Sequence, residues 1–131
     1  MDKPKILLVD DEPDLVQLVS LRLQAAGYEV AAAYDGQEGL DQVKQYQPHL
    51  VILDLMLPKM DGYKVCRLLK FDERYKTIPV LIFTARAQVE DIKLAMDCGA
   101  DAYLTKPFEA SILLEKLKEL LQKAKVGVKK E

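Results

Sequence analysis

The stretch Leu50-Val51-Ile52-Leu53-Asp54-Leu55-Met56 decides the fold, because it is an aliphatic run that contains a single carboxylate. The run is β-branched near its start and lies between Pro48 and Pro58. This pattern predicts a strand that is buried on both faces, as in a parallel sheet. An ionised carboxylate in such surroundings is strongly disfavoured without a partner. We therefore expect Asp54, at the end of this strand, to have polar or charged neighbours.

Polar side chains also stand at the ends of three other aliphatic runs. Asp10 and Asp11 follow the first run, Thr84 follows a run that ends at Phe83, and Lys106 follows 102–105. In an open α/β sheet the carboxyl ends of parallel strands share one edge, and ligands bind there. We therefore expect all these groups to converge on Asp54.

Strand-like and helix-like segments alternate five times along the chain. The expected strands are 5–9, 28–33, 50–56, 79–83 and 102–105, and the expected helices are 12–26, 35–46, 63–69, 88–98 and 108–123. Asp35 is placed to cap the second helix, and Gly27 to end the first. Such alternation predicts a three-layer α/β domain with a parallel sheet covered on both faces. We predict one domain at residues 1–124, followed at 125–131 by a tail or the start of a linker.

The composition is that of an ordinary globular domain. Half of the 131 residues are hydrophobic, and 19 basic against 21 acidic residues give a net charge of -2. The sequence has no basic patch with interleaved aromatic residues, so we do not expect this chain to bind nucleic acid directly. We also expect no membrane span and a cytoplasmic location. Cys66, Cys98 and His49 lack metal-ligand spacing, which predicts two buried or half-buried thiols and a surface imidazole.

The acidic groups expected at the sheet edge need a cation. Three carboxylates at neighbouring strand ends repel one another by about 4 kcal/mol per pair at 4 Å and an effective dielectric near 20. Hard oxygen ligands without thiolate or imidazole favour Mg²⁺ or Mn²⁺. Carboxylates, a divalent ion, a lysine and a hydroxyl together suit phosphoryl transfer. A carboxylate can itself be the nucleophile that forms an acyl phosphate, and Asp54 is best placed for this. An Asp-Asp pair after a strand is, by itself, more often a helix cap.

With these residues the chain resembles the receiver domains of the bacterial two-component response regulators, the CheY-like superfamily. The motifs of the resemblance are Ile6–Glu12, Leu53–Gly62, Phe83–Ala85 and Gly99–Phe108, and they span residues 5 to about 123. The resemblance implies a flavodoxin-like sheet of strand order 2-1-3-4-5. It also implies a phosphorylation-dependent signalling switch that promotes its own phosphorylation and dephosphorylation, not an enzyme that turns over a separate substrate.

The resemblance further implies the roles of the acidic residues. Asp54 accepts a phosphoryl group from the phosphohistidine of a sensor histidine kinase or a histidine phosphotransfer protein. Asp11, Asp54 and the main-chain carbonyl of Met56 bind Mg²⁺. Asp10 supports the metal through water.

The same resemblance implies a switch at the other strand ends. Thr84 and Lys106 contact the phosphoryl oxygens, and Tyr103 changes rotamer with phosphorylation. The Lys106-Pro107 bond resembles the family's cis peptide. The face made by the 88–98 helix, the fifth strand and the final helix then controls a partner or an output domain, and two phosphorylated copies can pair.

Two other classes of protein share parts of this pattern. A flavodoxin has the same fold class, but this chain places two acids after the first strand where a flavodoxin has a hydroxyl-rich phosphate loop. A phosphatase of the haloacid-dehalogenase type also uses an aspartyl nucleophile with Mg²⁺, yet it needs an Asp-x-Asp arrangement after its first strand, which is absent here. The sequence leaves open whether the receiver stands alone or belongs to a longer regulator or hybrid kinase.

Overall fold

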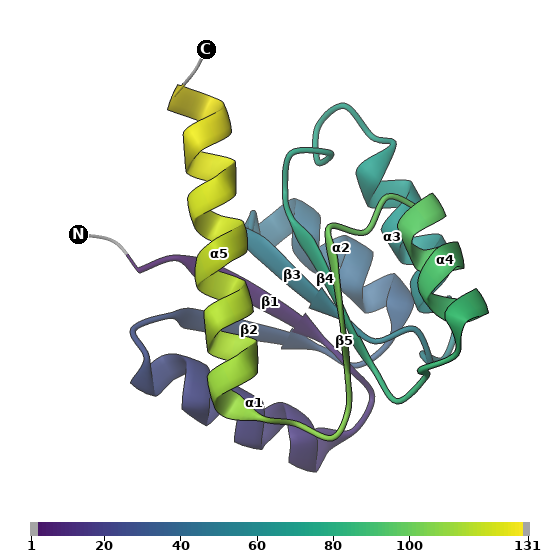
Figure 1. The fold of residues 1–131 in the computed structure, drawn as a ribbon, viewed down its shortest axis with the longest axis horizontal. Helices are drawn as coiled ribbons and strands as arrows, with labels where there is room; N and C mark the ends of the chain where they lie inside the picture. Colours follow the sequence, from purple (N-terminus) through teal and green to yellow (C-terminus); the bar gives the residue numbers. More distant parts are fainter. Residues whose placement is uncertain (1–2, 130–131) are drawn as a thin grey trace.

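The computed structural model describes residues 3–129, with side chains to residue 124, and shows a parallel sheet between two layers of helices (Figure 1). The strands are β1 (Lys5–Val9), β2 (Glu29–Ala33), β3 (Leu50–Leu53), β4 (Val80–Thr84) and β5 (Ala102–Thr105). They lie in the order β2-β1-β3-β4-β5, and every neighbouring pair is parallel. The predicted doubly wound α/β fold and its strand order are therefore confirmed.

Each strand is followed by a helix whose start is defined by local sequence. The helices are α1 (Pro13–Ala25), α2 (Gly36–Tyr46), α3 (Gly62–Lys70), α4 (Val89–Asp97) and α5 (Ala110–Lys129). Asp35 and Asp61 cap α2 and α3, because their carboxylates accept a main-chain N–H from the first turn. The first position of α1 is Pro13, which has no N–H to lose there. Within residues 3–129, no helix combines the length and the apolar character needed to cross a membrane.

The two faces of the sheet carry separate hydrophobic cores, as Figure 1 indicates from the helices on each side. Leu8 and Ile52 belong to the core that α1 and α5 cover, together with Leu117 of α5. The neighbouring residues Leu7 and Val51 belong to the core on the opposite face, which α2, α3 and α4 cover. Alternating side chains of the same strand thus enter different cores, which explains why the central strands are apolar throughout.

Two thiols and one imidazole lie where the sequence predicted them. Cys66 and Cys98 are free and buried between α3 and the end of α4. His49 is exposed before β3, and its Nδ1 accepts the main-chain N–H of Lys5 at 2.9 Å.

Three element boundaries differ from the prediction by two residues or more. β3 ends at Leu53, before the end of the aliphatic run, because Asp54 Oδ1 accepts the Met56 N–H at 3.1 Å and the chain turns away from the sheet. α5 begins at Ala110 and continues to Lys129, past the expected end near 123. Of the expected tail at 125–131, the structure describes only this helical backbone, and 130–131 lie outside the described residues. The domain boundary at 124 remains a prediction.

The apolar stripes predicted for the 63–69 and 12–26 helices include Leu68 and Ala26, but both side chains are exposed. Leu68 lies on the outer side of α3, whereas Val65, Cys66 and Leu69 face the core as expected. Ala26 lies beyond the last residue of α1, at its C-cap, and therefore leaves the apolar stripe of the helix.

Glycine at position 62 holds the loop after β3 close to the acidic end of the strand. A Cβ atom on Gly62 would lie 2.2 Å from the main-chain oxygen of Asp54 and 2.5 Å from the Cα of Leu55. The Gly62 N–H also donates to the Leu55 carbonyl at 2.9 Å. This close approach fixes how α3 starts relative to Asp54.

We predict that Gly62→Ala destabilises the protein by about 3 kcal/mol, at the upper end of overpacking costs, because backbone has to move. Gly27→Ala is the matched control: Gly27 has a φ of 98° and open space around it. Its cost is therefore only the left-handed conformation, about 1–2 kcal/mol. Urea unfolding measures both variants, and equal losses of stability would contradict the steric role of Gly62.

Candidate functional site

Three carboxylates meet at the carboxyl edge of the sheet. β1 and β3 are adjacent and Val9 pairs with Leu53, so the next residues, Asp10 and Asp54, lie side by side. One carboxylate oxygen each of Asp10, Glu12 and Asp54 lies within 4.8 Å of the others. Asp10 is 1% and Asp54 4% exposed, whereas Glu12 stands exposed at the rim. The site is therefore an acidic pocket with two buried walls and one solvated wall.

The ammonium group of Lys106 lies among these carboxylates. Its Nζ is 2.6 Å from Glu12 Oε1, 2.9 Å from Asp54 Oδ2 and 3.0 Å from Asp10 Oδ2. Burial alone would lower the pKa of Lys106, but the hydrogen bonds to Glu12, Asp54 and Asp10 outweigh it and raise this pKa. Lys106 therefore remains charged at neutral pH. The Lys106-Pro107 peptide is cis, as the resemblance implied.

Asp10 is the carboxylate that burial affects most clearly. Burial raises its pKa, opposed by hydrogen bonds from Lys106 and from the Glu12 N–H at 3.0 Å. A raised pKa means that the folded protein disfavours the ionised form of Asp10 relative to the unfolded chain. The charge on Asp10 therefore costs stability at neutral pH when no further cation is present.

The charges and donor atoms of this pocket fit a divalent cation. Three carboxylates against one ammonium leave two negative charges without a counter-charge, and all the donors are hard oxygens, which Mg²⁺ prefers. Asp11 is exposed next to this group and is not one of the three clustered acids. The predicted metal roles of Asp11 and of the Met56 carbonyl stay predictions.

Glu12 is the residue that the sequence interpretation missed at this site. The sequence assigned it only to the start of α1, where it is indeed the N-cap residue. Its carboxylate does not cap the helix but binds Lys106. The available signal was its position as the third acid of the run Asp10-Asp11-Glu12.

Thr84 lies at the end of β4 with its hydroxyl fully buried. Thr84 Oγ1 accepts the main-chain N–H of Arg86 at 3.4 Å, so this hydroxyl is bound to the loop that follows β4. The Arg86 carbonyl in turn accepts the hydroxyl of Tyr103 at 2.9 Å. Burial raises the pKa of Tyr103 to about 12, so its hydroxyl keeps its proton. Through these two hydrogen bonds, the loop after Thr84 links the end of β4 to the side chain of Tyr103 in β5.

The Arg86 side chain extends the same network to two helices. Its guanidinium lies 3.2 Å from Asp91 Oδ1 in the first turn of α4. The hydroxyl of Tyr63, in the first turn of α3, donates to the same oxygen at 3.0 Å. Movement of Arg86 would therefore change contacts with β4, β5, α3 and α4 together.

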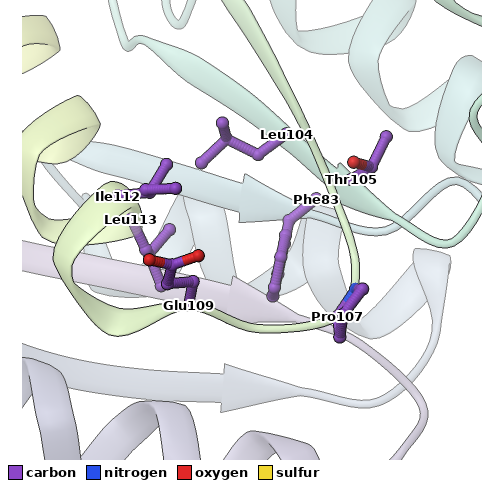
Figure 2. Close-up of a pocket in the computed structure, with 7 residues that line it drawn as sticks. All are labelled: Phe83, Leu104, Thr105, Pro107, Glu109, Ile112 and Leu113. Carbon is purple, nitrogen blue, oxygen red and sulfur yellow. The ribbon is translucent and has the colours of Figure 1, made fainter.

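A hollow of about 250 Å³ lies outside the acidic site, between β5 and the start of α5 (Figure 2). Its lining is mostly apolar, with one carboxylate at the rim, and consists of Phe83, Leu104, Thr105, Pro107, Glu109, Ile112 and Leu113. None of the clustered acids lines it. This hollow is separate from the charged chemistry of the sheet edge.

A doubly wound parallel sheet with acids after β1 and β3, a hydroxyl at the end of β4 and a lysine after β5 defines the receiver class of signalling domains. The family model of the response regulator receiver domain matches residues 6–118. The chain belongs to this family.

Relatives and solved structures agree with this assignment. The chain is 48% identical over 120 residues to the DNA-binding dual master transcriptional regulator RpaA of Synechocystis sp., covering 92% of this chain and 50% of that protein. It is 38% identical over 123 residues to the alkaline phosphatase synthesis transcriptional regulatory protein PhoP of Bacillus subtilis, covering 94% and 50%. The chain thus spans about half the length of the curated relatives it matches.

Among solved structures, the chain is similar to the chemotaxis response regulator CheY4 of Vibrio cholerae, with 34% identity and a TM-score of 0.84 over 90% of this chain and 98% of that one. It is also similar to a CheY-like receiver domain protein from Methanospirillum hungatei, with 29% identity and a TM-score of 0.90 over 96% and 99%. These structures match the receiver domain nearly end to end. The chain is accordingly a receiver domain of a two-component response regulator and not a classical enzyme.

We predict that Asp10→Asn raises the melting temperature by a few degrees in metal-free buffer. A carboxyl whose pKa is raised on folding supports the fold below its unfolded pKa, and this support is lost as the pH rises through the folded pKa. At neutral pH its charge therefore costs stability, and the neutral amide removes that cost. Asp14→Asn, an exposed acid of the first turn of α1, is the control. An unchanged or lower melting temperature in Asp10→Asn would contradict the prediction.

Proposed function

We propose that this chain is a phosphorylation-dependent switch whose phosphoryl acceptor is Asp54. The observation that carries the proposal is the position of its carboxylate: Asp54 is 4% exposed, lies beside Asp10, and has Oδ2 at 2.9 Å from the Lys106 ammonium. The side of the pocket at Glu12 is open to solvent, and a phosphodonor would reach Asp54 from this side.

The reaction is a transfer between two nucleophiles. A carboxylate oxygen of Asp54 forms a bond to phosphorus while the bond from phosphorus to the donor's histidine nitrogen breaks, and the electron pair of that bond stays on the imidazole. The product is an aspartyl phosphate. Lys106 and Thr84 would bind the phosphoryl oxygens, and the same groups would assist phosphorylation by small donors and the later hydrolysis.

The residues that would hold Mg²⁺ are Asp11, Asp54 and the main-chain carbonyl of Met56, with Asp10 acting through water. When bound, the ion supplies positive charge that offsets the acidic cluster and the phosphoryl oxygens. A cation at this place is supported by the two uncompensated negative charges of the pocket and its all-oxygen donor set, whereas the roles of Asp11 and the Met56 carbonyl follow from the family resemblance. Mn²⁺ satisfies the same donors.

The signal would leave the site through the loop after Thr84. A phosphoryl group on Asp54 offers new acceptor oxygens for the Thr84 O–H, and drawing the hydroxyl toward them would move Oγ1 away from the Arg86 N–H that it accepts. Ala85 is small and leaves room for the loop to move. Since the Arg86 carbonyl holds Tyr103, movement of the loop would release this ring and repack the face of α4, β5 and α5.

The proposed partners follow from this arrangement. A sensor histidine kinase or histidine phosphotransfer protein would supply the phosphoryl group in the cytoplasm. An output domain or a downstream protein would recognise the face of α4, β5 and α5, and phosphorylated copies would pair there. RpaA is named as a DNA-binding regulator and is about twice the matched length, which supports an output domain beyond this chain. The phosphatase and flavodoxin alternatives are not favoured, because the matched family is the receiver domain.

We predict that a small phosphodonor with Mg²⁺ adds one phosphoryl group to the protein, and that Asp54→Asn abolishes this addition because the amide is not a nucleophile. Intact-protein mass spectrometry measures the increase in mass. Asp14→Asn is the control and should be labelled like the wild type. Undiminished labelling of Asp54→Asn would refute the proposed acceptor.

We also predict that Thr84→Ala weakens the coupling between Asp54 and Tyr103. Allosteric couplings are typically about 1–3 kcal/mol, so the loss of one hydrogen bond of about 1 kcal/mol should remove a large share. NMR spectra with Mg²⁺ and beryllofluoride should show shifts as far as Tyr103 and α4 in the wild type but mainly near Asp54 in the variant. Thr105→Ala, an exposed site on β5, is the control. Wild-type shifts confined to the acidic pocket would contradict the switch.

A further inference from the structure

We infer that Glu12 is an exchangeable partner of Lys106, which occupies the hydrogen-bonding position that a phosphoryl oxygen takes after transfer. Glu12 Oε1 makes the shortest of the three ion pairs at this site, 2.6 Å from Lys106 Nζ. The inference rests on the proposed phosphorylation of Asp54 and adds a residue that controls how readily Lys106 meets the phosphoryl group.

The number of donors on Lys106 requires such an exchange. An ammonium group has three N–H donors. In this structure three carboxylates surround it, with Asp10 at 3.0 Å and Asp54 at 2.9 Å besides Glu12. Lys106 thus has no donor in reserve for an oxygen of the phosphoryl group. One of the three carboxylate contacts has to be given up.

Burial decides which contact is given up. The side chains of Asp10 and Asp54 are only 2% and 4% exposed, so water cannot take the place of Lys106 at either of them. The Glu12 side chain is 60% exposed and can exchange Lys106 for water. Exposed ion pairs contribute about 0–1 kcal/mol, so this exchange is inexpensive. The ion pair between Glu12 and Lys106 is therefore the one that breaks when a phosphoryl oxygen binds Lys106.

Glu12 also carries charge at the open side of the pocket. Its carboxylate is one of the three that lie within 4.8 Å of one another. An anionic phosphodonor meets this charge first, because Asp10 and Asp54 lie deeper. Removing it should therefore favour both the approach of the donor and the contact of Lys106 with phosphoryl oxygens.

The test is Glu12→Gln compared with Asp14→Asn. Both variants remove one exposed carboxylate near the start of α1, but Asp14 has no place among the carboxylates around Lys106. At saturating Mg²⁺ we expect Glu12→Gln to bind beryllofluoride about three- to fivefold more tightly than the wild type, as the loss of an exposed ion pair allows. Acetyl phosphate should label it faster and with a weaker dependence on salt. Asp14→Asn should resemble the wild type.

Three results would overturn the inference. Equal beryllofluoride affinity in both variants would mean that the Glu12 contact does not compete for Lys106. Weaker binding in Glu12→Gln alone would mean that Glu12 aligns Lys106 for the phosphoryl group. A loss of Mg²⁺ affinity of tenfold or more, measured without beryllofluoride, would make Glu12 a metal ligand. Labelling of the wild type on Asp54 tests the proposed function separately, and circular dichroism confirms that each variant is folded.

Discussion

The contact between the Lys106 ammonium and the carboxylate of Asp54 crosses a whole strand, and the layout of the site depends on it. β4 lies between β3 and β5, and neighbouring strands are about 4.8 Å apart, so Lys106 reaches about 10 Å across the sheet. Its stem passes Phe83 of β4, with Nζ 5.9 Å from the ring centroid. Only a long cationic side chain can bridge this distance. Strand order and side-chain length together therefore place one positive charge inside the acidic pocket.

This arrangement is kept in place by parts of the molecule that carry no charge. Asp10 and Asp54 follow strands whose side chains enter two hydrophobic cores, one on each face of the sheet. The cores fix the ends of β1 and β3, and Gly62 fixes the loop behind Asp54. Buried acids that repel one another can persist only because this apolar framework is stable enough to offset their cost. The site is thus supported by burial elsewhere, and a cation bound there would relieve the same cost.

Sequence periodicity predicted the elements of this fold because the strands are predominantly apolar runs and the helices carry apolar stripes. The parallel register of β1 and β3 then places Asp10 beside Asp54, because each follows its strand directly. Glu12 escaped prediction, because a residue at a helix start has an ordinary explanation, and its side-chain direction depends on where Lys106 ends. Thr84 was predicted correctly at the carboxyl edge of the sheet. Its hydroxyl accepts the Arg86 N–H, however, and this contact depends on the conformation of the loop. The sequence carries no periodic signal for either contact.

The contacts of Arg86 explain how a change at Asp54 could alter the surface around α4 and β5. Its N–H, its carbonyl and its guanidinium bind three different residues, Thr84, Tyr103 and Asp91. A loop held at three points has few intermediate positions, since a shift that breaks one bond misaligns the others. Under the proposed switch this segment would be a two-state element, which a ligand shifts only by its differential affinity for the two states. Binding couplings are reciprocal. A partner that prefers one position of this loop must therefore alter the affinity of the Asp54 site for a phosphoryl mimic by the same factor.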